Sequence, residues 1–335
     1  MAGDAGPGVK TSTRWQFPGG GRTETGSRSA SYAPPAPSPP PINRRRPIKF
    51  SIATAWIDPS ELPAIAREAD RLGYDSIAVS DHVVNIEELR TPYPYSADGE
   101  RRWKSFDPWV DPMVAIGALG AVTERIRFFT NVYVLPMRDP FTTAKTVATA
   151  SIFTGGRVSL GIGMGWCEDE FDLIGQQFRR RGARSDEMLE LLATLWQGGW
   201  VEHHGEFYDV PRLEMTPPPP APIPILVGGM SDAALRRAAR HNGWISDLIS
   251  TDDAAGYIAR IDAMREETDR HGDFDMVVSL SDAVTVDQFR RAEEVGVTNV
   301  LTMPWVYYGG FDLSLAQKLE GMGRFAEEIM APLTS

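Results

Sequence analysis

The sequence predicts an α/β protein of the (β/α)8 TIM-barrel class, with insertion loops after the second and fourth strands. Eight short apolar runs, each followed by a helical segment, alternate from Ile48 to the end of the chain. The runs are continuously apolar, as expected for parallel strands covered on both faces. Eight such units in about 290 residues fit a closed barrel. A doubly wound sheet, the alternative, would need fewer strands and a reversal of strand order.

The first four units follow from apolar runs and from helix boundary signals. Asp58-Pro59 suits the start of a helix and Gly73 its end. The polar stretch Asn85–Asp107 is the insertion after the second strand. We expect strands at 49–53, 76–79, 127–134 and 158–162, and helices at 60–72, 111–122 and 140–153.

The second half continues the alternation after a long loop, Gln197–Pro222, which contains four consecutive prolines. This loop and the insertion Asn85–Asp107 are expected to shape a substrate pocket. We expect helices at 185–196, 232–241, 254–271, 287–295 and 313–330, and strands at 223–227, 244–249, 276–280 and 299–303.

Composition narrows the class of protein. The chain has 335 residues, 34 basic and 45 acidic side chains and a net charge of -11, which argues against nucleic acid or an anionic membrane as the main partner. No apolar run approaches the roughly 18 residues of a membrane span. The single cysteine, Cys167, excludes an internal disulfide and a thiolate metal cluster, and we interpret it as a small buried hydrophobe. A cytoplasmic enzyme acting on a small molecule is expected.

Residues 1–47 differ from the rest of the chain. They are rich in Gly, Ser and Pro, and basic residues outnumber acidic ones. Such a segment cannot bury enough apolar surface to fold, so we predict a disordered N-terminal extension and a barrel domain at 48–335. It lacks the apolar core of a secretory signal. A linker, a weak electrostatic arm and an extension without function remain open.

The most informative motif is Val158–Trp166, in which Gly161, Gly163 and Gly165 alternate along a strand and an aromatic residue follows. Glycine leaves room for the backbone to approach something bulky. A tight strand-to-helix turn is the structural alternative. The acidic tract Glu168–Glu170 and the apolar helix beyond it favour a binding loop. The motif is not a dinucleotide fingerprint, because Trp166 stands where the third glycine would be.

A second glycine loop, Gly228-Gly229, ends the fifth strand and precedes a helix. Free amides at a helix start favour a phosphate, although Ser231 or Asp232 could cap that helix instead. The loops after strands four and five would be neighbours on the barrel rim. Together they suit a phosphorylated cofactor, and neither carries the lysine of a nucleotide-hydrolysing loop.

Asp81-His82 follows the second strand, where a barrel enzyme places catalytic groups. The imidazole could transfer a proton near neutral pH, or it could simply hydrogen-bond a neighbouring loop. A metal-dependent hydrolase would carry more ligands: the first strand ends in Ala53–Trp56 without histidine, and His203-His204 has no partner at helical spacing. We predict no metal site.

The chain resembles the luciferase-like monooxygenase superfamily, and within it the coenzyme F420-dependent oxidoreductase branch. The matching segments run through nearly the whole predicted barrel in the family's order. They are Leu72–Ser76, Ser80–Val83, Ala121–Arg127, Leu135–Pro140, Gly155–Trp166, Arg181–Glu187, Pro224–Gly229 and Ala234–Ala239.

The resemblance implies hydride transfer between a deazaflavin and a small organic substrate. It also implies a homodimer and a separate enzyme that reduces the cofactor. Within the same fold, a monooxygenase using reduced FMN and oxygen is the alternative, and a non-catalytic flavin-binding relative is another.

By position, the resemblance also assigns roles to residues. His82 would orient the substrate or transfer a proton, and a non-prolyl cis peptide at Asn131-Val132 would lie behind the ring. The implied cofactor contacts are Asp81, Asn131, Val132, Val134, Met164, Gly165, Asp169, Gly228 and Gly229.

One position departs from the family pattern. The sugar-phosphate dehydrogenases of this group carry a proton-accepting carboxylate after the strand-four glycine, and here that residue is Trp166. The departure argues against sugar-phosphate oxidation. Trp56 and Trp166 would instead wall an apolar substrate pocket, with Tyr93, Tyr95 and Trp103 as companions.

Overall fold

The computed structural model describes residues 47–334, and the predicted disorder of the N-terminal extension lies outside them apart from Pro47. The parallel strands close into a barrel: each pairs with its neighbour, β1 pairs with β11, and β3 pairs with β5. The predicted TIM barrel is therefore confirmed. Its strands are β1 (Lys49–Ala53), β2 (Ser76–Val79), β3 (Arg127–Thr130) with β4 (Tyr133–Val134), β5 (Val158–Gly163), β8 (Ile225–Gly228), β9 (Gly243–Ile249), β10 (Asp275–Leu280) and β11 (Asn299–Thr302).

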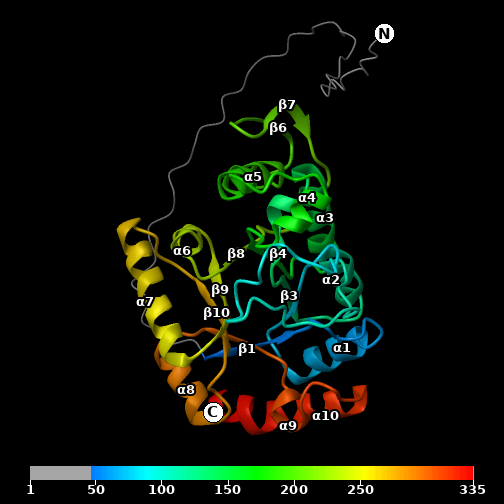
Figure 1. Cartoon of the computed structure of the whole chain (residues 1–335), viewed down its shortest axis with the longest axis vertical. Helices are drawn as coiled ribbons and strands as arrows, with labels where there is room; N and C mark the ends of the chain where they lie inside the picture. The colour runs from blue at the N-terminus through cyan, green and yellow to red at the C-terminus, as the bar shows by residue number, and fades with distance from the viewer. Residues whose placement is uncertain (1–46, 335) are drawn as a thin grey trace, which may run out of the picture. The chain divides into compact units, whose positions relative to one another are not determined.

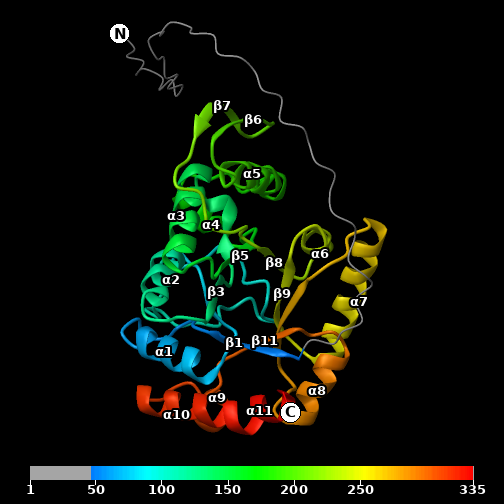
Figure 2. The same cartoon turned by 180° about the vertical axis from the view of Figure 1, so that it is seen from behind.

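The helices lie outside the strands (Figures 1 and 2). Several begin where a polar side chain accepts backbone hydrogen bonds: Asp111 from Met113 and Val114, and Asp139 from Thr142. The longer helices are α1 (Leu62–Leu72), α2 (Pro112–Gly120), α3 (Pro140–Phe153), α5 (Arg181–Leu195), α6 (Asp232–Ala238), α7 (Thr251–Glu267), α8 (Val286–Glu294) and α10 (Leu315–Phe325). Short turns are η1 (Leu135–Met137), α4 (Glu168–Leu173), α9 (Val306–Gly309), η2 (Ala326–Met330) and α11 (Ala331–Thr334).

Two predicted elements differ from the structure. The predicted loop Gln197–Pro222 contains an antiparallel hairpin, β6 (Trp200–His204) and β7 (Asp209–Glu214), beyond α5. Both faces of this hairpin carry polar residues, so the sequence does not show the alternation of apolar and polar residues that indicates a strand. The predicted strand 127–134 is interrupted at Asn131-Val132, and the peptide between these residues is cis, as the resemblance implied.

The barrel interior is closed below the strand ends. A layer of buried side chains from six of the barrel strands packs together there: Ala78, Phe129, Leu226, Ile245, Val277 and Leu301. Outside the strands, Phe50 contacts Phe289 and Phe325 edge to face, with ring centroids 5.3 Å away in both pairs. Any ligand site must therefore lie above the packed layer, at the C-terminal ends of the strands. No helix in residues 47–334 is long and apolar enough to cross a membrane.

Candidate active site

A cavity of about 810 Å³ opens at the C-terminal ends of the barrel strands. Its floor includes Ile245 and Leu301 of the packed layer. The cavity brings together eleven residues that the sequence singled out: Trp56, Asp81, His82, Asn131, Val132, Val134, Met164, Gly165, Trp166, Gly228 and Gly229. Asp169 is not among the residues that line it.

Asp81 is held by the protein itself. Its Oδ2 accepts a hydrogen bond from the Val134 amide at 2.9 Å, and its Oδ1 accepts one from Arg138 Nη2 at 2.6 Å. Burial raises the pKa of Asp81, and the Arg138 guanidinium opposes that rise. Both carboxylate oxygens already have protein partners, so the chief effect of Asp81 is to fix the segment that follows β3.

His82 is oriented by a carboxylate that the sequence analysis did not assign. Its Nδ1 lies 3.1 Å from Oε2 of Glu170, and the other oxygen of Glu170 accepts from the Val83 and Val84 amides. With Nδ1–H donating to this carboxylate, Nε2 has no hydrogen-bond partner in the described part of the chain and is the nitrogen that can exchange a proton. The acidic tract Glu168–Glu170 was the available signal for Glu170.

Aromatic rings surround His82. The ring centroids of Trp103 and Trp109 each lie 4.7 Å from the imidazole, and that of Trp166 lies 6.4 Å away. Tyr93 contacts both Trp103 and Trp166, at 5.4 and 5.2 Å. Trp56 meets Trp109 at 6.5 Å, which extends the wall. The aromatic residues that the sequence singled out thus line one cavity, and Trp109 joins them although the sequence analysis did not name it.

The insertion after β2 is fastened to the barrel at two points. Asp169 accepts hydrogen bonds from Arg90 Nε at 2.7 Å and from the Thr91 hydroxyl at 2.7 Å. These partners hold the pKa of Asp169 well below its usual range. At the other end, Arg102 donates to both oxygens of Asp247, at 2.7 and 2.8 Å. Asp169 thus anchors the insertion that carries the aromatic residues. It does not line the cavity, so its predicted contact with the cofactor stays a prediction.

The glycine run packs against the segment that follows β3. A Cβ on Gly163 would lie 2.4 Å from one methyl of Val132, and a Cβ on Gly228 would lie 2.6 Å from the other. Gly165 has φ +72°, and its Cβ would meet Phe171 and Val134 at 2.7 Å. The bulky groups that the glycines admit are therefore side chains of the segment after β3 and, for Gly165, also of α4.

A cation lies on the same side of the cavity. Arg181, at the start of α5, lines the cavity and donates from Nε to the carbonyls of Met164 and Gly165, each at 3.1 Å. It forms no ion pair with a carboxylate in the described residues. Ser231 caps α6 by accepting from the Ala234 amide, as the alternative interpretation of that loop expected. Arg181 therefore provides the stronger attraction for a phosphate here.

These features fit a cofactor with a planar ring and a phosphate. Val132, Val134 and Met164 offer apolar surface at the strand ends, and Arg181 offers positive charge nearby. The indole nitrogens of Trp56 and Trp109 are buried without a hydrogen-bond partner. Among residues 47–334 no cluster of three or more His, Cys, Asp or Glu side chains is placed to hold a metal ion.

Comparison with known proteins agrees with this arrangement. The family model for luciferase-like monooxygenase matches residues 43–295. Uncharacterized protein Rv0940c of Mycobacterium tuberculosis is 39% identical over 286 residues, covering 85% of this chain and 99% of that protein. An F420-dependent glucose-6-phosphate dehydrogenase of Nakamurella multipartita is 32% identical over 206 residues, 61% of this chain and 55% of that protein.

A solved structure shares the fold. The coenzyme F420-dependent tetrahydromethanopterin reductase of Methanopyrus kandleri superposes with a TM-score of 0.68 at 15% identity, covering 86% of this chain and all of that chain. The family match spans the barrel from β1 to β10, and so includes the cavity-lining ends of every barrel strand except β11. The chain therefore belongs to the luciferase-like monooxygenase family of oxidoreductases.

Proposed function

We propose that this protein is an F420-dependent oxidoreductase that transfers a hydride between the deazaflavin and a small, apolar organic substrate. The observation that carries the proposal is the His82–Glu170 pair on the wall of a cavity of about 810 Å³. A bound deazaflavin supplies or accepts the hydride, and the protein must then move a proton and exclude water. The glucose-6-phosphate dehydrogenase relative supports the choice of cofactor.

The proton step belongs to His82. Its Nδ1 is engaged by Glu170 at 3.1 Å, so Nε2 exchanges the proton at a substrate oxygen. The buried Glu170 carboxylate holds the imidazole in this orientation while the proton moves. Rings of Trp103, Trp109 and Trp166 keep water from this proton and favour an apolar substrate.

Cofactor binding is assigned to residues at the ends of β4, β5 and β8 and at the start of α5. Val132 and Val134 would lie against the ring, and Met164 and Gly229 along the chain that leads to the phosphate. Arg181 would bind the phosphate, since it is a cation of this wall without a carboxylate partner in the described residues. Asp81 would hold the ring-side backbone through the Val134 amide.

We also propose that the enzyme is a cytoplasmic homodimer served by a separate cofactor-reducing enzyme. Apolar side chains on α2 and α3 support the dimer: Val114 is 73% exposed, Phe153 67% and Phe141 41%. Light scattering on the purified chain would measure the mass directly, and a monomer at micromolar concentration would refute the dimer.

Cofactor identity is tested by titrating the purified protein with F420 and with FMN while following the absorption and fluorescence of each. We expect saturable F420 binding, and turnover with members of a panel of apolar ketones and alcohols. His82→Gln should keep F420 binding and lose turnover, whereas Arg67→Gln on the exposed face of α1 should change neither. Binding of FMN without F420, together with oxygen consumption, would instead establish the monooxygenase that the family description favours.

A further inference from the structure

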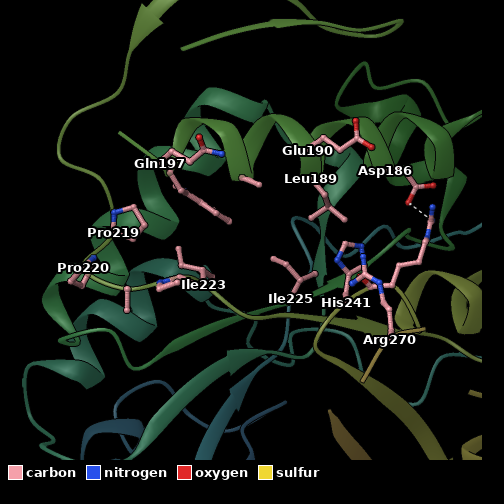
Figure 3. Close-up of a pocket in the computed structure, with 15 residues that line it drawn as sticks. Asp186, Leu189, Glu190, Gln197, Pro219, Pro220, Ile223, Ile225, His241 and Arg270 are labelled. Carbon is pink, nitrogen blue, oxygen red and sulfur yellow. Dashed lines mark hydrogen bonds and ion pairs between the residues drawn. The ribbon is translucent and has the colours of Figure 1, made fainter. Parts of the chain in front are cut away.

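A second cavity, of about 650 Å³, lies at the opposite end of the barrel strands from the candidate active site. Ile225, which lines it, is the first residue of β8, whereas Gly228 at the other end of that strand lines the first cavity. The second cavity lies between α5, the proline segment before β8, the turn before β9 and the segment before β10 (Figure 3). Its volume is within the range of small-molecule sites, about 300–1,000 Å³.

One part of this cavity is apolar. Leu189 of α5 projects toward Ile223 and Ile225 from the opposite wall (Figure 3). Trp196 and the prolines Pro219 and Pro220 continue the apolar lining toward one end. Such a wall would hold a hydrocarbon or ring-bearing body of a ligand by the hydrophobic effect.

The other end is cationic. Arg240, His241 and Arg270 line it together with Asp186. The side chain of Glu190 points away from His241 and Arg270 (Figure 3). Asp186 is already shared: it accepts from Arg237 Nε at 2.7 Å and from Arg240 Nη2 at 3.2 Å.

Positive charge therefore exceeds negative charge at this end. Arg270 donates to the Arg240 carbonyl and forms no ion pair in the described part of the chain. Burial, with Arg240 and Arg270 adding to it, lowers the pKa of His241 to about 4. The His241 ring is thus neutral at pH 7 and can donate one hydrogen bond, and the two guanidiniums lack a full complement of anions.

We propose that this cavity binds a small amphipathic carboxylate, with its apolar body against Leu189, Ile223 and Ile225 and its carboxylate between Arg240 and Arg270. The apolar wall and the cationic end lie at opposite ends of one cavity, and that arrangement selects a molecule with one anionic end. This site is separate from the proposed redox site, and its occupation requires neither F420 nor turnover.

The test is calorimetric titration of the full chain with octanoate, without cofactor. We expect saturable binding of one molecule per chain, and at least tenfold weaker binding of octylamine, which has the same chain length and the opposite charge. A double variant, Arg240→Gln with Arg270→Gln, should lower the affinity for octanoate at least tenfold. The exposed Arg67→Gln serves as the matched control and should leave the affinity unchanged.

A second variant tests the apolar part without disturbing the core. Ala193 is an exposed residue of α5 that lines the cavity, so Ala193→Trp would fill the space from the surface. It should abolish octanoate binding while the circular dichroism spectrum stays the same. Absence of saturable octanoate binding, equal binding of octylamine, or full binding by the Ala193→Trp chain would overturn the proposal.

Discussion

The packing of Val132 gives a quantitative prediction about two glycines on different strands. One methyl of Val132 lies where a Cβ on Gly163 of β5 would come within 2.4 Å, and the other lies 2.6 Å from a Cβ on Gly228 of β8. Neither glycine has a positive φ, so space rather than backbone conformation excludes a side chain. Gly163→Ala should therefore destabilise the protein through overpacking, by about 1–3 kcal/mol.

Removing both methyls of Val132 should abolish this destabilisation. In a Val132→Ala background the nearest atom to the new Cβ is the Cβ of residue 132, at 3.5 Å, which is ordinary van der Waals contact. Alanine also restricts the unfolded chain more than glycine, which stabilises by about 0.4–1 kcal/mol where the native backbone permits. The effect of Gly163→Ala on the free energy of unfolding is thus expected to differ between backgrounds. It should be destabilising when Val132 is present and neutral or stabilising in the Val132→Ala background.

The assay is urea unfolding of the four chains in this double-mutant cycle, without cofactor. Gly161→Ala is the matched control, because its Cβ would lie 1.9 Å from the backbone carbonyl of Thr130, which no change at position 132 removes. It should destabilise equally in both backgrounds. If the Gly163→Ala penalty is the same with Val132 as in the Val132→Ala background, the steric account of the glycine run is refuted.

Three further outcomes are expected. Glu170→Gln should lower turnover by about 10²–10⁴-fold with cofactor affinity retained, because the Gln amide would donate to His82 Nδ1 and leave the ring proton on Nε2; an unchanged pH–rate profile would contradict this. Asp81→Ala should destabilise the protein by about 1–3 kcal/mol in urea unfolding, since it removes the carboxylate partner of the partly buried Arg138, and adding Arg138→Met should recover part of that loss. The neutral His241, with its pKa near 4, contributes stability that is complete above about pH 6.5, where the unfolded side chain is also neutral, and is lost as the pH falls toward 4. His241→Gln should therefore reduce the stability difference between pH 7 and pH 4.5 by about 2–3 kcal/mol, and an identical difference in both chains would show that His241 is not responsible.

The barrel was predictable because its strands are separate apolar runs with clear boundaries. The runs at 49–53 and 76–79 match β1 and β2 residue for residue, since turn and cap residues flank them. The hairpin of β6 and β7 was missed because residues such as His203 and His204 give both faces polar side chains. The arrangement of apolar residues along a strand reflects which of its faces are buried, so a strand with little buried surface is hard to recognise from the sequence.

The position of the candidate site could be predicted from the sequence, but the hydrogen bonds between its side chains could not. Its location follows from the rule that barrel sites lie at the C-terminal strand ends, and eleven assigned residues do line the cavity. The hydrogen-bond partners could not be predicted in this way. The order Glu168-Asp169-Glu170 does not indicate that Glu170 contacts His82, 88 residues earlier in the chain, or that Asp169 accepts hydrogen bonds from Arg90 and Thr91. Those contacts depend on how a helical turn, α4, faces two different loops.

Trp166 and Glu170 place an aromatic ring and a carboxylate at different positions in this site from those that the resembled dehydrogenases use. Where the resembled sugar-phosphate dehydrogenases place a carboxylate, Trp166 packs 5.2 Å from Tyr93 and 6.4 Å from His82. The carboxylate that does serve the site, Glu170, is buried behind His82, and both of its oxygens are engaged. From there Glu170 fixes the orientation of the imidazole through Nδ1. Aromatic rings and a carboxylate therefore take separate positions around His82: the rings of Trp103, Trp109 and Trp166 lie beside the imidazole, and Glu170 holds its Nδ1.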